Sequence, residues 1–160
     1  ELLLKNDAWI VPTLATSYLS WQHIDEREPW VKEKMSAIEG PKNENLRKAY
    51  KAGVTIACGC DFGGGTITVH GNNGLELPLM VQDIGMTPME AIVAATKTGS
   101  KLMMREDELG TLEVGKLADV IIAEGNPLED IWLVSKPELI KVVIQDGVVK
   151  KNLLKGITCI

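Results

Sequence analysis

The stretch that decides the fold is Val54-Thr-Ile-Ala-Cys-Gly-Cys-Asp-Phe-Gly-Gly-Gly65. Its apolar start, from Val54 to Cys58, is short and nearly continuous, which is typical of a parallel strand buried on both faces. The strand leads to a carboxylate, Asp61, followed by three glycines that can adopt backbone angles closed to other residues. In α/β barrels the chemistry takes place at the carboxyl ends of the strands, so we predict Asp61 as a catalytic residue.

The residues before this stretch predict a second strand and two helices. Ala8-Trp-Ile-Val11 is β-prone and ends at Pro12-Thr13, and we expect residues 13–29 to be irregular. A helix is expected over 30–38, with a break at Gly40-Pro41. A further helix should run from Asn43 or Asn45 to Gly53. The order strand, helices, strand indicates a βαβ crossover in a parallel sheet.

Helical signals dominate the residues after the glycines. His70 to Gly74 should form a loop, and Leu75 to Ile84 an amphipathic helix that Gly85 ends. Thr87-Pro-Met-Glu90 then has the pattern of a capping box with proline at the first helical position. Behind it, Gly99 is expected to be the weak point between two helical pieces.

The character of the chain changes at residue 110. Leu109 to Asp119 is rich in turn formers, and Val120-Ile-Ile122 reads as a strand. Leu139 to Ile144 and Val148-Val149 are expected to form a hairpin around Asp146-Gly147. We therefore divide the chain into an α/β unit over 1–109 and a small antiparallel unit over 110–160.

Composition excludes several classes of partner. A chain of 160 residues can form one domain with a core but is too short for a complete (β/α)₈ barrel. The net charge of −5 argues against binding to nucleic acid, which needs an excess of positive charge. No apolar run is long enough to span a membrane. The sequence starts at Glu1 without a signal peptide, so a cytoplasmic location is expected, with an N-terminus that looks truncated. Three cysteines favour free thiols over a zinc site built from Cys58, Cys60 and His70.

An ordered set of segments resembles the C-terminal third of metal-dependent amidohydrolases, in the imidazolonepropionase-like and Xaa-Pro dipeptidase-like branch. Any single segment is weak evidence, but the ordered set is specific and covers nearly the whole chain. The segments are Ala8 to Leu14, Gly53 to Gly63, His70-Gly71, Gly85 to Thr96, Gly110 to Ile122, Asn126 to Asp130 and Val143 to Val149.

The resemblance implies a TIM-type (β/α)₈ barrel that holds one or two divalent metals, usually zinc, beside a small β-sandwich. Residues 1–109 would supply the last two strands and helices of the barrel, and residues 110–160 the C-terminal strands of the sandwich. Asp61 matches the eighth-strand aspartate, which binds metal and takes the proton from the metal-activated water. His70 and Gly71 match a loop near the substrate. Thr13, beside the seventh strand, is either a substrate contact or a turn hydroxyl.

The sequence departs from the family at the other metal ligands. The first-strand His-x-His pair, the bridging lysine and the fifth- and sixth-strand histidines have no counterpart. A catalytic zinc needs about three protein ligands, so we expect this chain alone to be inactive. The expected function is hydrolysis of C–N bonds in a dipeptide or other small molecule, with the missing N-terminal barrel portion as partner. The alternative is a non-catalytic module that forms homo-oligomers through its open sheet edges.

Overall fold

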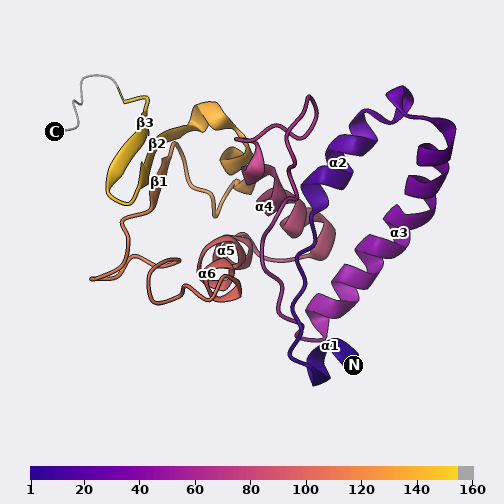
Figure 1. The fold of residues 1–160 in the computed structure, drawn as a ribbon, viewed down its shortest axis with the longest axis horizontal. Helices are drawn as coiled ribbons and strands as arrows, with labels where there is room; N and C mark the ends of the chain where they lie inside the picture. The colour runs from indigo at the N-terminus through magenta and orange to yellow at the C-terminus, as the bar shows by residue number, and fades with distance from the viewer. Residues whose placement is uncertain (155–160) are drawn as a thin grey trace.

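The computed structural model describes residues 1–154, and Cys159 therefore lies outside the described part. A short helix, α1 (Leu2–Lys5), begins the chain. Helical segments outnumber the strands in the described part of the chain, and a three-stranded sheet lies at the opposite end from the long helix α3 (Pro29–Lys51) (Figure 1).

The two predicted parallel strands meet at a single bridge between Ile10 and Ile56. Ile10 N donates to Thr55 O at 3.0 Å, and Ala57 N donates to Ile10 O at 3.0 Å. The next bond of a parallel ladder would need an N–H from residue 12, which is proline. The parallel direction is as predicted, but the paired segments are shorter than the strands we expected.

Two predictions for the connecting segment are wrong. Residues 13–29 are not irregular, because they contain helix α2 (Leu14–Gln22) and a 3₁₀ turn, η1 (Ile24–Glu26). The predicted break at Gly40-Pro41 is also absent, since α3 runs through both residues. Both are exposed, so water can bond the carbonyl that loses its partner at the proline.

The second half of the α/β unit is helical, as predicted. The segment before Gly85 comprises η2 (Asn73–Leu75), α4 (Glu76–Leu79) and a wider π-type turn, η3 (Met80–Ile84). Gly85 ends it with φ 91°. The capping box is confirmed: the Thr87 side chain accepts from Glu90 N, and the Glu90 side chain accepts from Thr87 N, at the start of α5 (Pro88–Val93). The chain stays helical through Gly99, where η4 (Ala94–Thr98) ends and α6 (Gly99–Leu102) begins, so the predicted weak point lies at the boundary between two helical pieces.

The C-terminal sheet is antiparallel, with the order β1 (Val120–Ala123), β2 (Ile140–Gln145) and β3 (Val148–Asn152). Two 3₁₀ turns, η5 (Ile131–Ser135) and η6 (Pro137–Leu139), precede β2. The hairpin at Asp146-Gly147 is confirmed, and both residues have positive φ, of 50° and 73°. Two consecutive positive φ angles match the twist of the flanking strands.

The buried side chains of the main core belong to the first unit, and Trp132 of the second unit packs against them. These buried side chains come from the start of α2, from Leu46 of α3, from Ile56 and Phe62, and from residues 79–94. The largest fully buried ones include Leu14, Leu79, Met80 and Ile84. Of the helices in the described part of the chain, none combines the length and the apolar character needed to cross a membrane.

Candidate functional site

Asp61 lies just beyond the second parallel segment, with its side chain exposed to solvent. Its φ of 52° is in the left-handed region, which aspartate tolerates better than most residues. Within residues 1–154 no hydrogen bond engages its carboxylate. The carboxylate is therefore available for a substrate, a proton or a metal ion.

The first turn of α2 holds the backbone at Asp61. Thr16 Oγ1 lies 2.5 Å from Cys60 O and 3.2 Å from Asp61 O, so one hydroxyl proton is shared between two carbonyls. Thr13, which precedes the same turn, also has a positive φ, of 49°. The two predicted residues that follow the parallel segments are thus linked through one helical turn.

His70 and Gly71 lie in the loop that follows the glycines. His70 Nε2 is 3.9 Å from the place that a Cβ on Gly64 would occupy, so the imidazole lies beside the glycine loop. The Asn73 side chain joins this loop to the second parallel segment. Its Oδ1 accepts from Gly71 N at 3.0 Å, and its Nδ2 lies 2.9 Å from Cys60 Sγ.

A buried carboxylate, Glu76, binds the first turn of α2, the same turn that contacts the backbone at Asp61. Its side chain is fully buried and accepts hydrogen bonds from Leu14 N at 2.8 Å and Ala15 N at 2.7 Å. Burial raises the pKa of Glu76, and the two backbone donors oppose part of that rise. These donors are the first two N–H groups of α2, which have no partner within the helix.

Cys58 lies at the end of the second parallel segment, and its thiol is expected to be unreactive. Burial raises the pKa of its thiol to about 12, and the nearby Glu76 carboxylate and Cys60 add to the rise. Neither Cys58 nor Cys60 forms a disulfide, which agrees with the expected free thiols.

The sequence profile of the amidohydrolase family matches residues 25–150. The chain belongs to the amidohydrolase family. Among curated relatives, it is 39% identical over 131 residues to the ochratoxinase of Aspergillus niger, covering 81% of this chain and 25% of that protein. It is 37% identical over 76 residues to the imidazolonepropionase of Symbiobacterium thermophilum, covering 48% of this chain and 18% of that protein.

Solved amidohydrolase-family structures have the same α/β fold. A Xaa-Pro dipeptidase with methionine bound in its active site superposes with a TM-score of 0.79 and 38% identity, over 94% of this chain and 36% of the dipeptidase chain. The chain thus spans about a quarter of the curated ochratoxinase and about a third of the dipeptidase.

Amidohydrolases generally use divalent metals, so we tested whether the residues present fit one. In the described part of the chain, no group of three or more His, Cys, Asp or Glu side chains could hold a metal ion. Asp61 is a suitable single oxygen donor, but one donor does not make a zinc site. The described residues therefore do not by themselves fit a catalytic metal.

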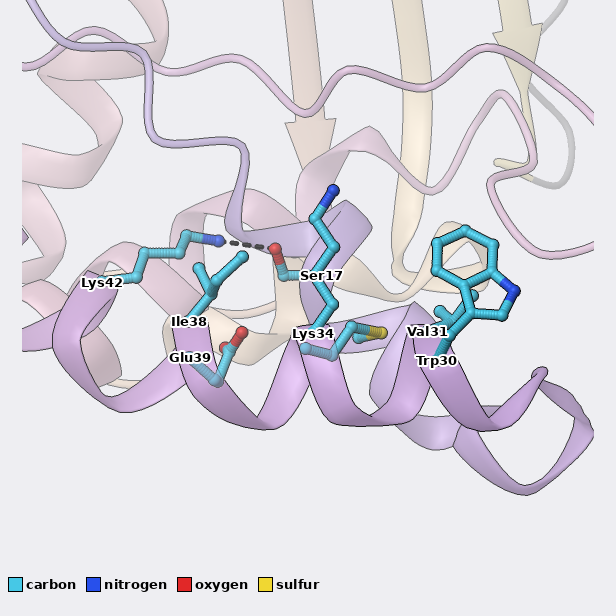
Figure 2. Close-up of a pocket in the computed structure, with 8 residues that line it drawn as sticks. Ser17, Trp30, Val31, Lys34, Ile38, Glu39 and Lys42 are labelled. Carbon is cyan, nitrogen blue, oxygen red and sulfur yellow. Dashed lines mark hydrogen bonds between the residues drawn. The ribbon is translucent and has the colours of Figure 1, made fainter.

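A groove of about 360 Å³ lies between α2 and α3, but it contains none of the predicted site residues. Figure 2 shows Lys42 of α3 and Ser17 of α2 joined by a hydrogen bond of 2.5 Å at one end, with Trp30 at the other. Its lining comes mainly from α3 and includes the apolar side chains of Val31 and Ile38.

Sequence reasoning missed three residues that connect the predicted site: Thr16, Asn73 and Glu76. Glu76 had a usable signal, since it is one charge within Leu75-Glu-Leu-Pro-Leu-Met80, an otherwise apolar run. Thr16 and Asn73 are ordinary polar residues in polar segments, and their partners are distant along the chain or in a loop. No local pattern would have distinguished them.

Proposed function

We propose that this chain supplies Asp61 as the proton-handling carboxylate of a site that hydrolyses amide, peptide or cyclic amide bonds. The observation that carries this proposal is the exposed, unbonded Asp61 carboxylate at the carboxyl end of a parallel segment in an amidohydrolase-family chain. Catalytic side chains of barrel enzymes occupy that end of the strands.

In the proposed reaction, the Asp61 carboxylate accepts a proton from the attacking water as the water oxygen bonds to the carbonyl carbon. The C–N bond then breaks, and the same carboxyl group returns the proton to the leaving nitrogen. A positioned general acid–base of this kind accelerates such reactions by roughly 10²- to 10⁴-fold. Its exposed position leaves Asp61 accessible to a small substrate.

The proposed substrate is a dipeptide, an N-acyl amino acid or another small cyclic or linear amide. Support comes from relatives named ochratoxinase, Xaa-Pro dipeptidase and imidazolonepropionase. His70 and Gly71 would contact the substrate from the loop beside the glycines, and Thr13 from the start of α2. The placement of His70 beside the glycine loop that follows Asp61 supports its proposed role.

Zinc is part of this proposal with Asp61 as one ligand. The remaining ligands would have to come from residues outside the described ones, in the same natural polypeptide or in a partner. We also divide the chain at residue 110, with residues 1–109 as barrel elements and residues 110–160 as part of a β-sandwich, and propose a cytoplasmic location.

The direct test is Asp61→Asn in the natural polypeptide that carries this sequence. Asparagine keeps the size of the side chain and tolerates a positive φ, so the loop should keep its conformation. The matched control is Asp146→Asn, which changes an exposed aspartate of similar φ, 50°, in the hairpin. We expect kcat/KM on dipeptides and N-acyl amino acids to fall by about 10²- to 10⁴-fold in the first variant and to stay unchanged in the second. A polypeptide without bound metal and inert towards amides and lactams would contradict the proposal.

A second candidate function is association with another protein surface. It is favoured by exposed apolar side chains around the edge strand β1, where Leu112 is 77% exposed, Val114 107% and Ile121 66%. Such a cluster commonly marks an interaction surface, and β1 has an unpaired edge within the described sheet. The partner would be a second copy of this chain or the N-terminal barrel portion. A well-behaved monomer in light scattering would contradict self-association.

A further inference from the structure

Glu76 caps the start of α2, although it lies more than 60 residues away along the sequence. The N-cap residue of α2 is Thr13, whose side chain makes no capping hydrogen bond. A capping side chain normally extends from a residue with extended backbone angles, whereas Thr13 has φ 49° and ψ 48°. The two Glu76 oxygens instead accept from Leu14 N and Ala15 N.

The same helical turn that Glu76 holds also contacts the backbone at Asp61. Thr16 follows Ala15 directly, and its hydroxyl lies within hydrogen-bond distance of Cys60 O and Asp61 O. A displacement of the first turn of α2 would therefore move the Thr16 hydroxyl away from these two carbonyls. The connection runs from Glu76, through backbone N–H groups and one helical turn, to Asp61.

Burying a carboxylate at this position costs free energy that an apolar side chain would not. Glu76 lies among Leu75, Leu77 and Leu79, and an apolar side chain would occupy the core without desolvating a charged group. A leucine, however, could not accept from two backbone donors. The carboxylate therefore contributes a fixed placement of the helix start, which packing alone would not provide.

We propose that Glu76 is a positioning residue, which holds Thr13 and the Asp61 backbone in a fixed relation through the first turn of α2. This inference deepens the proposed function and rests on it for the role of Asp61. The positioning itself can be measured without any activity, in the 160-residue chain.

The test compares Glu76→Gln with Ser100→Ala by NMR on isotope-labelled protein. The glutamine keeps the shape but replaces one acceptor oxygen with an NH₂ group, so Leu14 N or Ala15 N loses its partner. Ser100 is the matched control, because it is a buried polar residue (2% exposed) whose hydroxyl donates to Lys97 O, remote from α2.

In Glu76→Gln, we expect hydrogen exchange at one of the two helix-start amides to accelerate by about 10- to 100-fold, as for a lost charge-assisted bond. We also expect Asp61 to lose the strong intraresidue HN–Hα NOE that its positive φ produces. Ser100→Ala should destabilise the chain but leave both signals unchanged. If the amides exchange faster while Asp61 keeps its wild-type signals, Glu76 is only a helix cap and the inference is wrong.

Thr16→Val tests the other half of the connection, including the case in which Glu76→Gln does not fold. It should abolish the Asp61 NOE while the Leu14 and Ala15 amides stay protected. An unchanged Asp61 NOE would refute the connection. If instead the NMR results agree but Asp61→Asn leaves amide hydrolysis unaffected, the proposed function fails while the positioning of Asp61 by Glu76 stands.

Discussion

Thr16→Val should destabilise the protein through a single hydroxyl group. Thr16 is half-buried at the start of α2, and its Oγ1 lies 2.5 Å from Cys60 O and 3.2 Å from Asp61 O. Valine keeps the β-branched shape and so changes little else. The substitution leaves two carbonyls without this donor.

The expected loss in the free energy of unfolding follows from the single proton that the Thr16 hydroxyl can donate. A hydroxyl can make only one strong hydrogen bond at a time, and one such bond contributes about 0.5–1.5 kcal/mol net. Leaving the half-buried Cys60 carbonyl without a partner adds a fraction of the desolvation penalty, which is about 1–3 kcal/mol for a fully buried group. We therefore expect a loss of about 1.5 kcal/mol in the free energy of unfolding, which for a chain of this size lowers Tm by roughly 3–6 °C.

Urea unfolding and calorimetry measure this loss directly, with Thr96→Val as the control. Thr96 is exposed, and its hydroxyl donates to Ile92 O, four residues earlier, at 2.7 Å, where water can replace it. The control should change stability by less than about 0.5 kcal/mol, as exposed substitutions usually do. If Thr16→Val unfolds at the same urea concentration as the wild type, the hydroxyl does not hold the Asp61 loop.

Two other predictions concern glycine packing and thiol reactivity. Gly74→Ala would place a Cβ 2.1 Å from Val134 O, so we expect the free energy of unfolding, measured in urea, to fall by about 1–3 kcal/mol. The control, Gly40→Ala, lies in open space within α3 and should raise the free energy of unfolding by about 0.5–1 kcal/mol. Equal effects of the two variants would contradict the packing of η2 on η5. Because burial raises the pKa of Cys58 from 9.0 to about 12, iodoacetamide at pH 8 should label it about 10³-fold more slowly in the folded chain than in urea, as read by mass spectrometry. The unfolded chain loses this proton first, so the contribution of Cys58 to stability should fall as pH rises from about 9 to 12.

Elements specified by neighbouring residues were predictable from the sequence. The capping box needs only Thr87, Pro88 and Glu90, and the hairpin needs only Asp146-Gly147 between two apolar runs. In each case the signal and the structure lie within a few residues, so tertiary packing has little chance to override the local preference.

Errors arose where tertiary contacts oppose a local signal. Gly40-Pro41 is a strong helix breaker, yet α3 continues because its C-terminal half is anchored by Leu46 in the core and by a bond of 2.7 Å from Arg47 Nε to Asp83 O. Helix α2 forms where Leu14 and Ala15 are buried in the core and Glu76 accepts from the N–H groups of the same two residues. That helix has no side-chain cap from a neighbouring residue, so no local signal marks its start.

The geometry of the candidate site depends more on side chains than on strand pairing. The two parallel segments share two backbone hydrogen bonds, Ile10 N to Thr55 O and Ala57 N to Ile10 O. Pro12 has no N–H for the next ladder bond, and Thr13 and Asp61 both lie on that side of the bridge. The contacts that relate these two residues come from Glu76 and Thr16, which together engage two N–H groups and two carbonyls. Substitutions in these two side chains should therefore alter the site more than substitutions within the paired segments.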